Sequence, residues 1–259
     1  MRQVLILENV TKEFRTYHQY HAGLKALVLY PGQIMRHRER DRFLAINEVS
    51  FAVCGGETFG ILGRNGAGKS TLLGLIAGVL RPTAGKISVH GRISPLLELG
   101  VGFTQELTGV ENILINRVLL GLRRKEIEAK LDDIISFSGL GSFIDQPLKT
   151  YSSGMQIRLG FAIAIHVQPD ILLVDEVLAV GDAEFQEKCF SRITDLQRAG
   201  VTIVLVSHNL NTVETLCDRA VWLDKGRIVT LGSPQEVVAR YQSEIAHLLA
   251  TQESASVSV

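Results

Sequence analysis

The stretch Thr58–Ser70, TFGILGRNGAGKS, decides the fold of this chain. Its first five residues form a short apolar run that is typical of a buried strand. Gly63–Ser70 follows at once and satisfies every position of the P-loop pattern GxxxxGK[ST]. A helical pattern comes next, marked by the apolar residues Leu72, Leu73, Ile76 and Val79. Strand, glycine-rich loop and helix in this order predict an α/β fold built around a phosphate site.

The loop also predicts how nucleotide phosphates are held. Glycines let backbone amides curl around a β-phosphate, and the helix N-terminus adds the positive end of its dipole. Lys69 is expected to neutralise β- and γ-phosphate oxygens and to assist catalysis, and Ser70 to offer its hydroxyl to Mg²⁺. The predicted phosphate-site residues are Gly63, Arg64, Asn65, Gly66, Ala67, Gly68, Lys69, Ser70 and Thr71. A glycine-rich turn that only caps a helix is the alternative, which the flanking strand and helix disfavour.

Two further apolar runs end in polar residues. Residues 171–174 precede Asp175 and Glu176, and residues 202–206 lead to His208. Ligands of open α/β sheets bind at the carboxyl ends of the strands. We therefore expect Asp175 in the outer shell of Mg²⁺, Glu176 polarising the attacking water and His208 contacting the γ-phosphate. A solvated turn for the two carboxylates and a place beside a helix cap for His208 are the alternatives.

The composition excludes several classes of protein. The 259 residues carry 27 Lys+Arg and 27 Asp+Glu, so gross positive charge does not mark a nucleic-acid binder. No apolar run approaches the roughly 20 residues needed to cross a bilayer, and the N-terminus lacks a signal-peptide pattern. The three cysteines show no metal-ligand spacing. A reduced, cytoplasmic protein is expected.

The neutral total conceals a basic segment at about 15–43. From Arg15 to Arg42 there are six Lys/Arg residues and two acids, which leaves 21 basic and 25 acidic residues elsewhere. Four of the basic residues alternate along the chain as Arg36, Arg38, Arg40 and Arg42. The segment is too long for a hairpin loop between the strands expected at 4–10 and 47–53. It is either an insertion that contacts an anionic partner or a solvated charged loop.

The remaining pattern places helices and a hairpin. Residues 107–165 are predominantly helical, opening with a capping box formed by Thr108 and Glu111. One apolar helix face is predicted for residues 127–135, ended by Gly139. Residues 185–196 predict an amphipathic helix, residues 220–231 a hairpin, and Ser233 the cap of a terminal helix. A frayed tail is expected from Thr251 onward.

At Tyr151–Met155, YSSGM, the chain resembles the ATP-binding cassette (ABC) ATPases. The family signature is usually Leu-Ser-Gly-Gly-Gln, altered here at three of five places. The resemblance implies that Tyr151, Ser152, Ser153, Gly154 and Met155 face the γ-phosphate held by the other cassette of a head-to-tail homodimer. Exposed hydroxyls and amides at a helix N-terminus suit such an anion, although an ordinary Ser N-cap is the alternative. Asp182 matches the dimer-contact position and could also cap the following helix.

The altered signature is similar to that of the bacterial polysaccharide-export subfamily, as are residues 97–103 and 106–113. That resemblance implies export of lipid-linked O-antigen, capsule or teichoic acid chains through an integral membrane permease. Glu98 stands nearest the position of a metal-contacting Gln, with Gln105 as competitor and a solvent-facing Glu98 as alternative. The adenine-stacking aromatic is expected at Phe14; its competitors are Tyr17, Tyr20 and Phe43.

The predicted architecture is α/β: a P-loop ABC ATPase core with a mixed or parallel sheet, an antiparallel β edge and an α-helical subdomain at about 104–168. One nucleotide-binding domain is expected over residues 1–245, followed by the helix end and a flexible tail at 246–259. ATP and Mg²⁺ are the implied cofactors, and nucleic acid is not an expected partner. The implied location is peripheral, on the cytoplasmic face of the inner membrane. The alternative is a non-transport ABC ATPase or an ABC transporter ATPase for a different substrate, whereas a P-loop kinase or GTPase leaves the signature loop unexplained.

Overall fold

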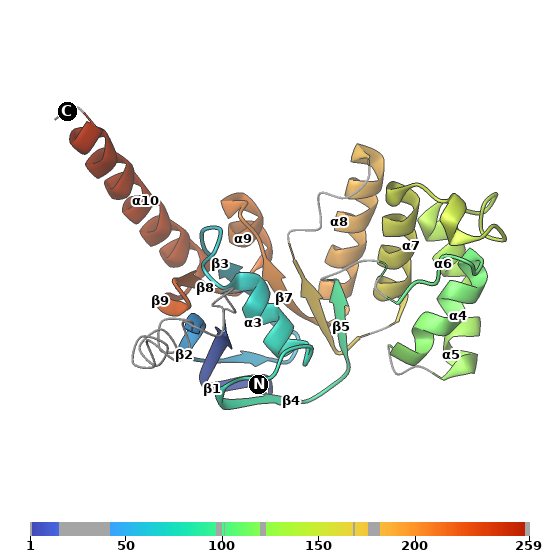
Figure 1. Ribbon diagram of the computed structural model, residues 1–259, viewed down its shortest axis with the longest axis horizontal. Helices are drawn as coiled ribbons and strands as arrows, with labels where there is room; N and C mark the ends of the chain where they lie inside the picture. The colour runs from blue at the N-terminus through green and yellow to red at the C-terminus, as the bar shows by residue number, and fades with distance from the viewer. Residues whose placement is uncertain are drawn as a thin grey trace, which may run out of the picture.

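A computed structural model describes residues 2–15, 42–96, 100, 102–119, 123–167, 169–175 and 182–256, with backbone alone for 117, 119 and 247–256. Two sheets organise the fold (Figure 1). The larger sheet has the strand order β5(Ile93–Leu96), β6(Ile171–Val174), β7(Thr202–Val206), β3(Thr58–Leu62), β8(Arg219–Asp224) and β9(Arg227–Gly232). The smaller one has the order β2(Arg42–Cys54), β1(Gln3–Arg15) and β4(Ala84–Val89).

The larger sheet is parallel from β5 to β8, and β9 closes it as an antiparallel edge. Strands β3, β6 and β7 are buried along their whole length, as their continuous apolar runs predict. Apolar side chains of both sheets and of α3(Lys69–Ile76) form one core between the two sheets. The predicted α/β class with a mixed sheet and an antiparallel edge is confirmed.

Helices occupy one end of the molecule, on the right in Figure 1. They are α4(Gly109–Leu119), α5(Arg124–Glu128), α6(Leu131–Ser138), the 3-10 turn η1(Leu148–Thr150) and α7(Ser153–His166). The predicted capping box opens α4: the Glu111 carboxylate accepts from the Thr108 amide at 2.8 Å, and Thr108 Oγ1 accepts from the Glu111 amide at 3.2 Å. These helices share their own apolar core.

Three further helices lie among the described residues. α8(Ala183–Arg198) packs with α7 against the larger sheet, and α9(Leu210–Leu216) joins β7 to β8. α10(Pro234–Ser256) rests its first turns on Trp222 and then projects from the body (Figure 1). Within the described ranges no helix combines the length and the apolar character needed to cross a bilayer.

Four local predictions are corrected. The first two strands are longer than predicted, because their outer ends continue to pair as far as Arg15 and Arg42. The single helix face predicted at 127–135 is divided between α5 and α6, since the Lys130 amide bonds to the Ile127 carbonyl at 3.0 Å and tightens the turn.

The two remaining corrections concern helix ends. α3 ends at Ile76, because the chain turns back there and the Leu80 amide bonds to the Gly74 carbonyl at 3.0 Å. Leu80 therefore packs on the core while Val79 stays 75% exposed. At the other end of the chain, α10 continues to Ser256 where a frayed tail is predicted.

Candidate nucleotide site

The P-loop leaves the end of β3 and is closely packed from behind. A Cβ on Gly63 would lie 2.4 Å from the Leu223 carbonyl oxygen, and one on Gly68 would lie 2.6 Å from the Ala45 oxygen. Gly68 also has φ 103°, in the region that favours glycine. Glycine is thus required at both positions because the backbones of β8 and β2 approach the loop.

Two backbone hydrogen bonds hold the loop in place. The Gly226 amide, in the turn between β8 and β9, donates to the Ala67 carbonyl at 2.9 Å. The Gly226 carbonyl accepts from the Asn47 amide of β2 at 2.8 Å. The sequence predicts this turn as a hairpin but gives it no part in the site. Its only sequence signal is the glycine of Asp224-Lys225-Gly226.

The lysine of the loop is buried, whereas the hydroxyl residue that follows it is exposed. Lys69 is 7% exposed, and its Nζ donates to the Gly63 and Arg64 carbonyls at 2.9 and 3.2 Å, within the curl of the loop. Arg64, Asn65, Gly66 and Ser70 are exposed, and Thr71 is half-buried in the first turn of α3. The loop therefore presents backbone and a lysine ammonium at a helix N-terminus, which is an arrangement that attracts anions.

The sheet topology places the other strand ends beside the loop. β7 pairs in parallel with β3 on one side and with β6 on the other. The half-buried Asp175 follows β6 and the exposed His208 follows β7, so both lie at the sheet edge from which the P-loop leaves β3. The turn at His208 is held by Ser207 Oγ, which accepts from the Asn209 amide at 3.0 Å.

The signature loop divides into buried and exposed parts. Tyr151 is 6% exposed and its hydroxyl donates to the Phe143 carbonyl at 2.8 Å, and Met155 packs partly into the same helical core. Burial first, and the Asp145 charge second, raise the pKa of the Tyr151 phenol. Ser152 and Ser153 are exposed, and Ser152 Oγ caps α7 by accepting from the Met155 amide at 3.2 Å. Ser152, Ser153 and the half-buried Gly154 are thus the part that can face a ligand, whereas the Tyr151 ring belongs to the core.

Asp182 has the predicted capping role and an unpredicted partner. Its Oδ1 accepts from the Phe185 amide at 3.0 Å at the start of α8. Its other oxygen pairs with Arg158 of α7, whose guanidinium lies 5.1 Å from the centre of the Phe185 ring. The residue therefore fastens α8 to the helix that begins at the signature loop, while its dimer contact stays a prediction.

The two described candidates for the adenine aromatic face each other. Phe14 of β1 and Phe43 of β2 are cross-strand partners, and Phe43 is 57% exposed. Two residues beyond Phe43, Ala45 places its carbonyl against Gly68 of the P-loop. The pair therefore lies within reach of a nucleotide held by that loop. Lys12, whose Nζ is 5.0 Å from the Phe14 ring centre, adds a cation that the sequence analysis does not single out.

Several predicted residues lie outside the described residues: Glu176, Glu98, Tyr17, Tyr20 and most of the basic segment, residues 16–41. Gln105 is described, and its exposed side-chain amide lies 3.5 Å from that of Gln156. Among the described residues no group of three or more His, Cys, Asp or Glu is placed to hold a metal ion. The oxygen donors Ser70 and Asp175 nevertheless fit Mg²⁺, which keeps several waters and takes few protein ligands beside substrate phosphates.

Fold and site together define an ATP-binding cassette ATPase. The chain belongs to the ABC transporter family. The sequence pattern of that family matches residues 46–179, which is just over half of this chain. It is 49% identical to the O-antigen export system ATP-binding protein RfbB of Klebsiella pneumoniae, over 95% of this chain and 100% of that protein. It is 42% identical to the teichoic acids export ATP-binding protein TagH of Listeria monocytogenes, over 90% of this chain and 68% of that protein.

The fold also matches that of a solved ATP-binding cassette, whose structure is dimeric. The ATP-binding cassette MJ0796, in a post-hydrolysis state bound to ADP and Pi, matches with a TM-score of 0.69 over 89% of this chain and 98% of that chain. The two sequences are 21% identical, so this likeness concerns the fold alone.

Proposed function

We propose that this chain is the ATP-hydrolysing subunit of an exporter that moves lipid-linked polysaccharide across the cytoplasmic membrane. The observation that carries the proposal is the meeting of the P-loop, Asp175 and His208 at one sheet edge. The relationship to proteins named for O-antigen and teichoic acid export supports the substrate class.

Each residue of the site has a separate role in this proposal. The P-loop amides and Lys69 hold the β- and γ-phosphates, and Ser70 and Asp175 hold Mg²⁺, which would neutralise phosphate charge when bound. Glu176 orients and polarises the attacking water, and His208 contacts the γ-phosphate. Phosphoryl transfer depends mainly on positioning and charge stabilisation, so a rigidly packed loop is what the reaction requires.

A second copy of the chain completes the site in this proposal. Ser152, Ser153 and Gly154 lie at the N-terminus of a 14-residue helix, and two of the three are exposed. In a head-to-tail dimer this anion site would contact the γ-phosphate on the partner. The dimeric state of the structurally similar MJ0796 supports this arrangement.

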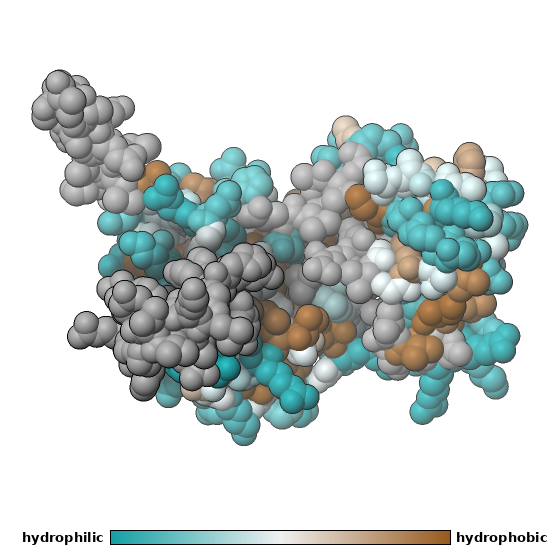
Figure 2. Space-filling view, viewed as in Figure 1, coloured by the Kyte–Doolittle hydropathy of each residue, from teal (hydrophilic) through white to brown (hydrophobic). Residues whose placement is uncertain are grey.

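The membrane partner is proposed to dock on the helical end. Figure 2 shows a largely hydrophilic surface, on which hydrophobic residues gather at the part where α4 and α5 lie and also beside α3. On α4, Ile115 is 41% and Val118 67% exposed. Exposed neighbouring apolar side chains suit contact with an apolar protein segment. Through such a permease the chain would sit at the cytoplasmic face of the membrane.

Export itself is the test. Deletion of the gene is expected to remove the surface polysaccharide and to leave lipid-linked polymer inside the cell, and the wild-type chain to restore export. The same complementation with Lys69→Ala should fail although the protein accumulates. Unaltered surface glycans in the deletion strain would contradict polysaccharide export and favour another substrate or a non-transport role.

The basic segment gives a second test of the substrate class. Replacing Arg36, Arg38, Arg40 and Arg42 by Gln should impair export while ATP hydrolysis by the isolated chain is unchanged, because the guanidinium groups would meet the phosphates of lipid or substrate. The matched control replaces the same four residues by Lys, which keeps the charge but not the bidentate fork. Full export by the Gln variant would show that the segment is only a solvated loop.

A further inference from the structure

The nucleotide site of this chain spans two separate sheets. The P-loop belongs to the six-stranded sheet, whereas the aromatic pair Phe14 and Phe43 belongs to the three-stranded sheet. Phosphates and base are therefore held by different bodies, and the angle between the two sheets determines whether both can be contacted at once. Contacts between the two sheets hold this angle, and several of them lie among the described residues.

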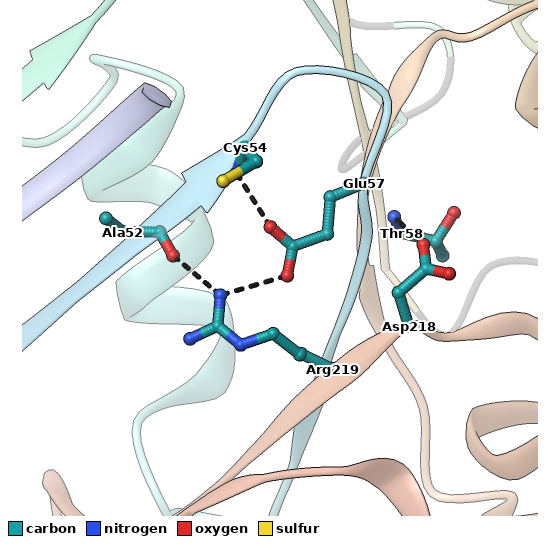
Figure 3. A network of polar contacts seen from close by, with 6 residues as sticks. All are labelled: Ala52, Cys54, Glu57, Thr58, Asp218 and Arg219. Carbon is teal, nitrogen blue, oxygen red and sulfur yellow. Dashed lines mark hydrogen bonds and ion pairs between the residues drawn. The ribbon is translucent and has the colours of Figure 1, made fainter. Parts of the chain in front are cut away.

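An ion pair between the buried Glu57 and the partly exposed Arg219 joins the two sheets at the edge opposite the P-loop (Figure 3). Arg219 Nη1 at the start of β8 donates to the Glu57 carboxylate at 3.0 Å and to the Ala52 carbonyl of β2 at 3.2 Å. The Glu57 carboxylate also accepts from the Cys54 amide at 2.7 Å, and its side chain is 7% exposed. The pair thus connects the last residues of β2 with the beginnings of β3 and β8.

Neighbouring contacts hold β8 to β3 and β3 to β2. Asp218 Oδ2 accepts a hydrogen bond from the Thr58 amide at 2.8 Å, and the Asp218 amide donates one to the Thr58 carbonyl at 2.8 Å. The Arg219 guanidinium lies 5.6 Å from the centre of the Phe59 ring, which stacks on Phe51 of β2 at 4.9 Å. By contrast, the covalent link is the glycine-containing turn Cys54–Glu57, which is intrinsically flexible.

Strand β2 connects the Glu57–Arg219 pair with Phe43, because Ala52 lies near one end of the strand and Phe43 near the other. Beyond Ala52 the strand is held again at Asn47, by its hydrogen bond to Gly226. The strand is not straight at this point, because Glu48 has φ 53° and the pairing of β2 with β1 shifts register beside Val49. A shift at Ala52 would therefore reach Phe43 through the paired backbones of β1 and β2.

We propose that Glu57 and Arg219 are positioning residues for the nucleotide base: they fix the three-stranded sheet, and with it Phe14 and Phe43, relative to the P-loop. This inference rests on the proposed function, since it needs a nucleotide in the P-loop and an aromatic pair that stacks on its base. Only Glu57 of the pair is buried, since the Arg219 side chain is 37% exposed, so the direct contacts of the pair and not its burial define the geometry.

The test compares ATP with inorganic tripolyphosphate, which has the phosphates and no base. The main variant is Glu57→Gln with Arg219→Met, which leaves no buried charge unpaired, and Arg219→Lys alone is a milder second variant. Affinities for both compounds are measured by calorimetry on the full chain with Mg²⁺. The matched control makes the same two exchanges in the exposed pair Glu128 and Arg124, which lies 2.6 Å apart on α5.

We expect the Glu57→Gln/Arg219→Met variant to lose about fivefold to tenfold in ATP affinity, which is less than the full contribution of base stacking to binding. It should bind tripolyphosphate like the wild type. In a Phe14→Ala/Phe43→Ala background, the Glu57→Gln/Arg219→Met exchange should cause no further loss of ATP affinity. Equal losses for ATP and tripolyphosphate, or a loss that adds in full to that of the aromatic variant, would overturn the inference. A wild-type chain that binds neither compound would overturn the proposed function as well.

Discussion

Lys69 shows how one side chain depends on the backbone around it. Its ammonium bonds to two carbonyls of the loop that it serves, while glycines at both ends of that loop admit the neighbouring strands. A cation held in this way can turn to phosphate oxygens without a large loss of side-chain freedom, because most of that freedom is already lost. The site is therefore largely preorganised at the level of single residues.

Exchange of Lys69 is the most direct test at this scale. Lys69→Ala should reduce ATP hydrolysis about a hundredfold or more, because the charge on the transferring phosphate would lose its main protein counter-charge. Steady-state phosphate release measures it, with the exposed Lys86→Ala on β4 as a control that retains full activity. Hydrolysis at the wild-type rate in Lys69→Ala would refute the assignment of the P-loop.

Gly226 makes a second prediction for a residue that carries no functional group. Its φ is +75°, and a Cβ there would lie 2.5 Å from the Ala45 carbonyl oxygen. Gly226→Ala should therefore lower the free energy of unfolding by about 1–3 kcal/mol and raise the KM for ATP, because the turn that holds Ala67 must shift. Chemical denaturation and ATPase kinetics report the two effects. Gly141→Ala, where no atom lies within 4 Å of the new Cβ, should change neither.

At the scale of elements, the helical end joins two surfaces of different character. The N-terminus of α7 exposes Ser152 and Ser153, whereas Tyr151 just before it is fixed in the core by its bond to Phe143. α4 packs into the same core and exposes Ile115 and Val118 on its outer side. Movement of either helix would thus be transmitted to the other through shared buried side chains.

The outer side of α4 can be tested by one charge. Val118→Glu should abolish co-purification with the permease while hydrolysis by the isolated chain is unchanged, because a carboxylate would be buried without a partner in the complex. The control is Val79→Glu, at a valine that is 75% exposed against 67% for Val118 but lies just after α3. Intact co-purification of Val118→Glu would exclude this face as the docking surface.

For the whole molecule, the decisive property is assembly. One cassette carries the P-loop on its sheet edge and the signature loop at the far end of α7, so each of these would serve a different nucleotide in a head-to-tail pair. The ATP-bound pair is expected to be transient in the wild type, since hydrolysis would separate it.

Glu176→Gln should make that pair stable. The amide cannot act as a base towards the attacking water, so the variant is expected to bind ATP, turn over slowly and elute as a dimer in gel filtration with ATP and Mg²⁺. Omission of Mg²⁺ or ATP should return it to the monomer position. A monomer under the full conditions would contradict the proposed sandwich of two cassettes.

The sequence by itself determined the P-loop, the buried strands before Asp175 and His208, and the caps at Thr108 and Ser233. These are local properties: a glycine pattern, an apolar run or a residue pair three positions apart has the same meaning wherever it occurs. The tertiary structure decided that Gly226 and Ala45 support the loop, that Tyr151 is a core residue, and that Arg219 joins two sheets through Glu57. Such contacts pair distant residues, for example Arg219 and Glu57 at 162 positions apart, and no local pattern encodes them, because they exist only when packing brings distant backbones together.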